Sequence, residues 1–257
     1  MNKNLVKNSL GYNTNLYVFQ DKDMFNYSVD TILLGNFVYI SKGTKRMLEI
    51  GANNGALSIF IADRYSKLHI DAVEIQQKAT QLAQSNVEFN NKQEQIRIIN
   101  QDFNLFWKEH IKNQRKKYQS IVCNPPFYKV EKTQIKTKNI TKEKLIATHE
   151  IEINLEQIIK GSSKIIEQKG YLNIVLPVER IVDLMELLRK YKFEPKRIQF
   201  VCPRINEKPK FVLIESRFMS GWGIHFQENL YLHPDDKSNH IYNDNIVNLY
   251  KPIKIKE

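Results

Sequence analysis

The segment Asn124-Pro125-Pro126-Phe127 combines groups that can act on a planar amine. Asn124 can offer its side-chain amide oxygen, and Pro125 can offer its backbone carbonyl. Because proline has a fixed φ and restricts the residue before it, both acceptors are held in place before a substrate arrives. Phe127 adds a surface on which a base can stack. We therefore predict a catalytic turn that acts on an amine such as the exocyclic amino group of adenine. The structural alternative is an ordinary turn that closes a strand.

A glycine-rich turn in residues 47–57 indicates a second binding element. Gly51 and Gly55 allow a ligand to approach the backbone closely. Asn53 and its neighbour occupy positions at which a dinucleotide-binding loop needs glycine, so a diphosphate ligand is disfavoured. Glu49 precedes the turn, where its carboxylate would repel a phosphate but would suit a cationic or amine-bearing ligand. S-adenosylmethionine carries such groups.

Two further acids follow predicted strands. Glu74 ends a strand nineteen residues after Gly55, where open α/β sheets place the acid that accepts hydrogen bonds from ribose hydroxyls. Asp102 follows the next strand and can accept from an adenine amino group, with Phe103 beside the ring. The structural alternatives are a helix cap for Glu74 and a loop turn for Asp102. Because the acids follow successive strands, we favour one shared cofactor site.

Strand-like and helix-like segments alternate from residue 46 onward. The predicted strands are Arg46–Ile50, His69–Glu74, Ile96–Asn100, Tyr118–Cys123, Tyr171–Leu176, Ile198–Cys202 and Phe211–Ser216. The predicted helices are Ala56–Tyr65, Gln76–Asn90, Leu155–Glu167 and Val178–Lys190. Residues 128–142 are predicted to form an exposed loop. This alternation is typical of an α/β fold built on a parallel sheet.

The remaining segments are predicted to be extensions of that sheet domain. Residues 1–45 form an N-terminal extension with a strand at Leu16–Gln20 and a helix from about Ser28 to Val38. Residues 46–220 form the ligand-binding domain. Residues 221–257 form a C-terminal extension, and the sequence indicates no role for it.

The composition indicates a soluble globular protein, because 42% of the 257 residues are hydrophobic and no apolar run approaches the ~20 residues that span a bilayer. The first residues lack the apolar core of a signal peptide, so we expect a cytoplasmic protein with no membrane partner. Cys123 and Cys202 lack the spacing of a disulfide framework or a zinc site, so we expect buried strand cysteines and no metal. A monomer is assumed.

The formal net charge of +11 indicates a polyanionic partner or a lysine-rich proteome. Six lysines and two glutamates lie between Lys129 and Lys144, directly after the predicted catalytic turn. We expect candidate RNA contacts at Lys129, Lys132, Lys136 and Lys138. The alternative is a solvated charged loop.

Several motifs resemble those of class I S-adenosylmethionine-dependent methyltransferases, and together they resemble the tRNA1(Val) (adenine(37)-N6)-methyltransferase family. The motifs lie at residues 26–35, 47–51, 71–74, 124–127, 147–150 and 187–197, within a match from about residue 16 to residue 220. The resemblance implies a Rossmann-like, seven-stranded, mostly parallel sheet with an antiparallel last strand and helices on both faces. It also implies methylation of the adenosine 3′ of the anticodon.

The resemblance assigns roles to individual residues. Asn124, Pro125, Pro126 and Phe127 would be catalytic. The expected cofactor-binding residues are Asp30, Glu49, Gly51, Asn53, Gly55, Glu74, Ile75, Asp102, Phe103 and Asn124, and the cofactor product would be S-adenosylhomocysteine. Two positions depart from the family pattern: Phe127 replaces the usual tyrosine, and Thr148 stands where arginine is expected before His149.

We therefore expect methyl transfer from S-adenosylmethionine to N6 of an adenosine in tRNA, without a metal or a covalent intermediate. The alternatives are methylation of a protein glutamine, methylation of adenine in DNA or ribosomal RNA, and a nucleic-acid-binding protein without catalysis. The basic charge disfavours the glutamine substrate, and the presence of Asn124 and Glu74 disfavours loss of catalysis.

Overall fold

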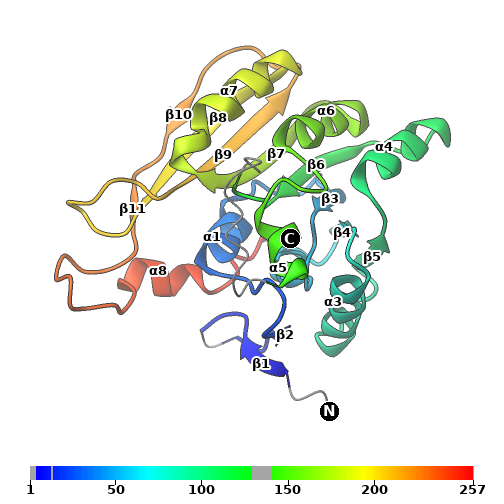
Figure 1. Ribbon diagram of the computed structural model, residues 1–257. Coiled ribbons are helices and arrows are strands. Elements are labelled where there is room, and N and C mark those ends of the chain that lie inside the picture. The colour runs from blue at the N-terminus through cyan, green and yellow to red at the C-terminus, as the bar shows by residue number, and fades with distance from the viewer. Residues whose placement is uncertain (1–3, 13, 129–140, 257) are drawn as a thin grey trace.

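The structure is a computed structural model, and it describes residues 4–12, 14–128 and 141–256. The strands are β1 Leu5–Ser9, β2 Tyr17–Asp21, β3 Arg46–Ile50, β4 His69–Glu74, β5 Ile96–Asn100, β6 Tyr118–Cys123, β7 Ile166–Pro177, β8 Phe193–Cys202, β9 Phe211–Phe218, β10 His225–Phe226 and β11 Leu230–Tyr231. The helices are α1 Val29–Phe37, α2 Ala56–Ala62, α3 Gln77–Phe89, α4 Phe103–Lys112, α5 Lys142–Thr148, α6 Leu155–Ile165, α7 Ile181–Lys190 and α8 Asp244–Leu249 (Figure 1).

A central sheet with the order β8-β9-β7-β6-β3-β4-β5 organises the molecule. Its strands are parallel except β9, which pairs antiparallel with both β7 and β8. The two-residue strands β10 and β11 extend the outer edge of β8. The predicted Rossmann-like class I methyltransferase fold, including its antiparallel last strand, is confirmed.

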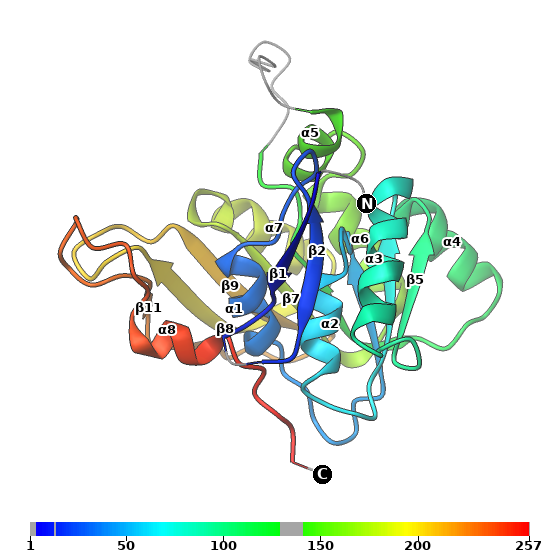
Figure 2. The ribbon, with the colours of Figure 1, turned by 90° about the horizontal axis from the view of Figure 1, so that it is seen from below.

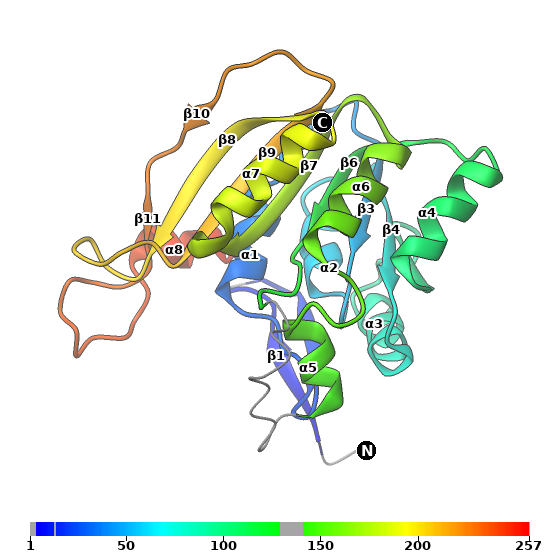
Figure 3. The ribbon, with the colours of Figure 1, turned by 45° about the horizontal axis from the view of Figure 1, so that its top comes forward.

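Helices cover both faces of this sheet (Figure 3). Helices α4, α6 and α7 lie on one face, and α1, α2 and α3 lie on the other. Each face has its own buried apolar cluster, because successive strand side chains point to opposite sides. In β3, Met47 joins the α1–α2 side and Leu48 joins the α4–α6 side. The parallel strands are therefore apolar on both faces, as their sequences suggested.

The predicted strands and helices are present, but many of their ends differ from the predicted ones by one to five residues, and β8 begins at Phe193 rather than Ile198. Four predicted strands, now β3 to β6, have the observed bounds. Strand β7 begins at Ile166 rather than Tyr171, and α6 ends at Ile165, because Ile166 pairs with Tyr118 before an irregularity at which Lys169 has a φ of 62°. Helix α4 was not predicted, although Asp102 caps it through hydrogen bonds from the backbone N–H groups of residues 104 and 105. Both predicted cysteine placements are confirmed, since Cys123 and Cys202 are buried in strands.

The β1–β2 hairpin docks on α3 through two asparagine side chains. Asn86 accepts from the Phe19 N–H at 2.7 Å and donates to the Phe19 carbonyl at 3.0 Å. Asn90 makes the same pair of bonds with Tyr17, at 3.0 and 2.7 Å. Each side-chain amide thus makes the pair of hydrogen bonds that the backbone of a neighbouring strand would make. The hairpin is held beside the loop between β3 and α2, because Asn86 also donates to the Asn54 carbonyl at 2.9 Å.

The C-terminal residues return to α1 and lie near the N-terminal segment (Figure 2). Asn36 of α1 donates to the Leu249 carbonyl at 2.5 Å and accepts from the Ile253 N–H at 2.9 Å. Helix α8 therefore lies beside α1. Among the described residues, no helix has the length and apolar character needed to cross a membrane.

Candidate active site

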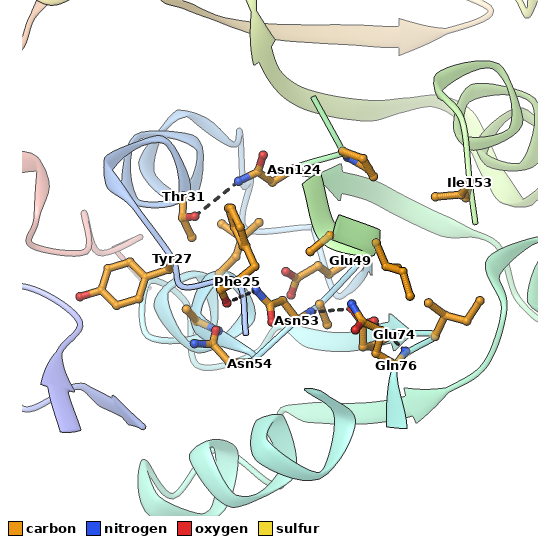
Figure 4. Close-up of a pocket in the computed structure, with 18 of the residues that line it drawn as sticks. Phe25, Tyr27, Thr31, Glu49, Asn53, Asn54, Glu74, Gln76, Asn124 and Ile153 are labelled. Carbon is orange, nitrogen blue, oxygen red and sulfur yellow. Dashed lines mark hydrogen bonds between the residues drawn. The ribbon is translucent and has the colours of Figure 1, made fainter. Parts of the chain in front are cut away.

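A pocket opens at the carboxyl ends of β3, β4 and β6 (Figure 4). It is lined by Phe25, Tyr27, Thr31, Glu49, Gly51, Ala52, Asn53, Asn54, Ala56, Leu57, Glu74, Ile75, Gln76, Asn124, Pro126, Ile146, Ala147, Glu152 and Ile153. A second pocket adjoins it, and the two linings share Gly51, Glu74, Ile75, Asn124, Pro126, Glu152 and Ile153. The glycine-rich turn, the three predicted acids and the catalytic turn thus lie at the edge where open α/β sheets bind ligands.

The two glycines of the turn have different surroundings. Gly51 has a φ of 76°, and a Cβ placed on it would meet nothing within 4 Å. The space over its backbone is therefore open for a ligand. Gly55 lines neither pocket, and a Cβ there would lie 3.3 Å from the Cβ of Ala83 in α3. Its φ of 80° and this close approach of α3 explain the glycine, so Gly55 shapes the turn without facing the pocket.

Glu74 is held by the backbone on both carboxylate oxygens. One oxygen accepts from the Asn53 N–H and the other from the Gln76 N–H, each at 2.8 Å. Asn53 reaches this position with a φ of 47°, and its side chain donates to the Phe25 carbonyl at 2.8 Å. Burial raises the pKa of Glu74, and the two N–H groups oppose that effect. Each oxygen still has a second lone pair for a ligand hydroxyl.

Glu49 is a buried carboxyl beside the same loop, and only 2% of its surface is exposed. The Ser58 hydroxyl donates to it from α2. Burial raises the pKa of Glu49 to about 8, and the nearby Glu74 adds to this rise. A cationic group bound in the pocket would offset the cost of ionising Glu49. The two carboxylates therefore form a set of acceptors that fits a ligand with both an ammonium group and ribose hydroxyls.

Asp30 fixes the orientation of the Asn124 amide. Asn124 donates through Nδ2 to the Asp30 carboxylate at 2.8 Å and to the Thr31 hydroxyl at 3.4 Å (Figure 4 shows the contact with Thr31). Because a carboxylate only accepts, the amide nitrogen must face Asp30. The amide oxygen has no hydrogen-bond donor among the described residues and is available at the pocket. Asp30 itself is 1% exposed and lies outside the pocket lining.

The remaining predicted cofactor residues lie in or beside the second pocket. Asp102, Phe103 and Ile75 line it together with Pro125. Asp102 uses one oxygen to cap α4, so its structural role is that of a helix cap rather than the predicted loop turn. The same residue also lines the pocket. Phe103 is 5% exposed and packs against Phe106, which leaves part of its ring at the pocket wall.

Phe127 lies outside both pocket linings. Its ring centroid is 5.8 Å from that of Phe211, and the Arg180 guanidinium donates to its carbonyl at 3.4 Å. Arg180 also donates to Glu150 at 2.8 Å, with both side chains largely buried. Arg180 thus supplies a cation beside the turn. Arg180 could not be predicted from a local motif, because its contact with Phe127 is made across 53 residues.

Several pocket residues were not predicted. They come from loops and from α5, where the sequence has no clear hydrophobic periodicity. These residues are Phe25, Gln76, Ile146, Glu152 and Ile153. The Thr141 hydroxyl accepts from the Lys144 N–H and so caps α5. This capping residue lies near the end of the predicted loop. The predicted RNA contacts Lys129, Lys132, Lys136 and Lys138 lie outside the described residues. Within the described ranges, no cluster of three or more histidine, cysteine or acidic side chains could hold a metal ion.

Comparisons with known proteins find relatives over most of the chain. The tRNA1(Val) (adenine(37)-N6)-methyltransferase of Bacteroides fragilis is 28% identical over 202 residues, which cover 79% of this chain and 81% of that protein. The enzyme of the same name from Tolumonas auensis is 28% identical over 199 residues, covering 77% and 78%. The resemblance inferred from the motifs is confirmed.

Solved structures show the same fold at low identity. A protein described as a predicted O-methyltransferase from Agrobacterium tumefaciens has a TM-score of 0.67 and 18% identity, over 88% of this chain and 98% of that one. The M. jannaschii tRNA m1G37 methyltransferase has a TM-score of 0.57 and 13% identity, over 86% and 59%. The family model of the methyltransferase small domain matches residues 28–198, which include the glycine-rich turn and Asn124. The chain therefore belongs to the methyltransferase small domain family.

Proposed function

We propose that this protein transfers a methyl group from S-adenosylmethionine to N6 of an adenosine in tRNA, with adenosine 37 of tRNA1(Val) as the first candidate. The observation that carries the proposal is the locked amide of Asn124. Its nitrogen is bound to Asp30, so its oxygen is left to accept a hydrogen bond from a substrate amine. An acceptor for amine N–H groups at the end of β6, beside a pocket with two buried carboxylates, suits N-methylation by a cationic methyl donor.

The pocket residues fit the cofactor by their chemistry. Glu74 would accept from the ribose hydroxyls, Glu49 would face the cationic part, and the open space over Gly51 would accommodate the chain of the ligand. Asp102 and Phe103 in the adjoining pocket suit an adenine ring, with Ile75 as an apolar wall. S-adenosylmethionine, when bound, supplies a methyl group on a sulfonium that is already activated.

The protein's own groups then act on the substrate amine. The lone pair of the adenine amino group is delocalised into the ring, so the amine is a weak nucleophile. Asn124 Oδ1 and the Pro125 carbonyl would accept its two N–H bonds and favour a more tetrahedral nitrogen. The prolines and Asp30 hold both acceptors before binding, which lowers the cost of organising them during the reaction. The proton released from the methylated amine can pass to water.

The names of the relatives support tRNA as the substrate class. Both relatives described above are named tRNA1(Val) (adenine(37)-N6)-methyltransferases, and the net charge of +11 suits a polyanion. A tRNA substrate implies a cytoplasmic enzyme. Enzymes that modify a base take it out of its stack, so the adenosine would be flipped into the site.

Nucleoside mass spectrometry tests the proposal. tRNA from cells with and without this protein should differ in N6-methyladenosine, and purified protein should restore the modification to tRNA1(Val) from the deficient cells. A transcript with guanosine at the target position is the matched control. Restored methylation of ribosomal RNA or of a protein glutamine, with no change in tRNA, would contradict the proposed substrate.

Cofactor binding should release a proton from Glu49. The pKa of Glu49 is raised from an ordinary value of 4.5 to about 8. At a pH between these values, Glu49 in the free protein holds a proton, and a bound cation would displace it. Affinity for S-adenosylmethionine should therefore rise with pH up to about 8. Calorimetric titration at pH 7 in buffers of different ionisation enthalpy measures the proton, and Glu49→Gln is the control that should release none from this site. Equal apparent enthalpies for the wild-type protein in all buffers would contradict the assignment.

Phe127 should contribute a ring to the flipped base although it is partly packed against Phe211. Phe127→Ala should lower kcat/KM for tRNA by the equivalent of about 1–3 kcal/mol, the usual contribution of stacking on an aromatic ring. Phe127→Tyr keeps the ring and should be nearly neutral. Steady-state methylation kinetics compare the two, and equal losses for both variants would show that the ring does not serve as a stacking surface.

A further inference from the structure

A third cavity, of about 520 Å³, lies beside the catalytic turn and is lined by residues from both ends of the chain. We call it the aromatic groove; its lining residues are Ser9, Gly11, Tyr12, Gln20, Tyr27, Ser28, Val29, Lys210, Phe211, Leu232, His233, Tyr242 and Tyr250. Phe211 begins β9, and because β9 is antiparallel, its start lies at the sheet edge where β6 ends. Leu232 follows β11, which is parallel to β8 and ends at the same edge.

The aromatic groove adjoins the candidate active site. Tyr27 lines both cavities. Phe211, in the wall of the groove, lies 5.8 Å between ring centroids from Phe127 of the catalytic turn. A ligand that extends past Phe127 would therefore meet Phe211 in the wall of the groove.

The groove presents an array of aromatic rings from both chain ends. The ring centroids are 4.9 Å apart for Tyr12 and Tyr250, 5.6 Å for Tyr250 and Tyr242, and 5.2 Å for Tyr242 and His233. The backbones are in close contact here, since a Cβ on Gly11 would fall 1.9 Å from the Tyr250 carbonyl oxygen. Tyr12 nevertheless exposes 49% of its surface, so part of its ring remains free to stack.

The charges of the groove favour an anion. Its lining contains Lys210 and His233 but no aspartate or glutamate, whereas the cofactor pocket contains Glu49, Glu74 and Glu152. The Lys210 ammonium lies 5.2 Å from the Phe211 ring centroid, so a positive charge is placed beside an aromatic face. Burial raises the pKa of the Tyr27 and Tyr250 hydroxyls, which keeps them neutral.

We propose that the aromatic groove binds a nucleotide adjacent to the target adenosine, with its base stacked on Tyr12 and its phosphate near Lys210. The inference rests on the proposed function, because it takes the ligand to be the RNA strand that carries the methylated base. Aromatic faces combined with lysine, without acidic groups, are the features that bind single-stranded nucleic acid. The N-terminal and C-terminal extensions thus acquire a joint role in holding the substrate strand.

Binding of a short RNA tests the groove without requiring methyl transfer. The probe is a fluorescent seven-nucleotide single-stranded RNA with adenosine at its centre, and affinity is measured by anisotropy. Tyr12→Ala should weaken binding roughly 5- to 150-fold, and Tyr12→Phe should bind like the wild-type protein. Lys210→Ala should lower the dependence of log Kd on log salt concentration by about 0.7, as expected for one lost phosphate contact. Trp222→Ala is the control, since Trp222 is 91% exposed but does not line the groove.

A second probe identifies which part of the RNA contacts Tyr12. Removing the bases on either side of the central adenosine should weaken binding to the wild-type protein. The same removal should have little further effect on Tyr12→Ala, because the stacking contact is already lost. The groove would be overturned as a base-binding site if the losses of binding free energy from base removal and from Tyr12→Ala were additive. An unchanged affinity of Tyr12→Ala would overturn it as well. A wild-type protein that binds this RNA but methylates no tRNA would contradict the proposed function alone, and one that binds no RNA would overturn both.

Discussion

Replacing Asn124 by alanine is expected to lower kcat for tRNA methylation by about 10²-fold or more while leaving the Kd for S-adenosylmethionine nearly unchanged. The amide oxygen is proposed to act on the substrate amine, whereas the cofactor is held mainly by the two buried acids. The variant should still fold, because Asn124 lies in a partly exposed turn after β6. Single-turnover methylation and calorimetric titration measure the two quantities separately.

Two further variants make this prediction specific. Asp30→Ala removes the acceptor of the Asn124 amide nitrogen without touching the substrate, so it should lower kcat by less than Asn124→Ala. Adding Asp30→Ala to the Asn124→Ala variant should lower kcat little further, since the amide that Asp30 positions is already absent. Asn173→Ala is the control, because Asn173 is a buried asparagine on the neighbouring strand β7 and lines neither pocket. Wild-type kcat in Asn124→Ala would refute the mechanism.

The central fold could be predicted because its signals are local and strong. Strands β3 to β6 are short apolar runs bounded by turns, and their bounds were predicted without error. The edge of the sheet was less predictable, because the two-residue strands β10 and β11 depend on pairing with β8. Helix α4 was missed although Asp102 caps it, since Asp102 was interpreted first as a ligand-binding acid.

Site residues could be predicted from the sequence where the residue type at a strand end has one main chemical use. Glu49, Glu74 and Asn124 were found from their positions at strand ends, and they meet in one pocket. The role of Asp30 and the position of Arg180 depend on side-chain contacts across 94 and 53 residues. The aromatic groove unites residues from both chain ends, and no period or motif in the sequence links Tyr12 with Tyr250.

Glu74→Ala is expected to weaken S-adenosylmethionine binding on the order of 10²-fold, because charge-assisted hydrogen bonds to ribose hydroxyls contribute about 1.5–3 kcal/mol each. Glu74→Gln should weaken binding as well. Both carboxylate oxygens accept from backbone N–H groups, of Asn53 and Gln76, so a glutamine NH2 would face a donor. Calorimetric titration gives the Kd for each variant.

A structural role for Glu74 predicts a different pattern, which the same variants can separate. If Glu74 only capped α3 and the glycine-rich turn, Glu74→Ala would lower the unfolding temperature and leave the Kd of the folded protein unchanged. If it also binds ribose, Kd must rise in protein that is still folded at the temperature of the titration. Glu143→Gln controls for charge alone, since Glu143 lies on α5 near Gln76 but outside the pocket lining. A rise in Kd for Glu74→Ala that Glu143→Gln does not reproduce would therefore assign the carboxylate to the cofactor, because neither loss of charge nor loss of the fold would explain it.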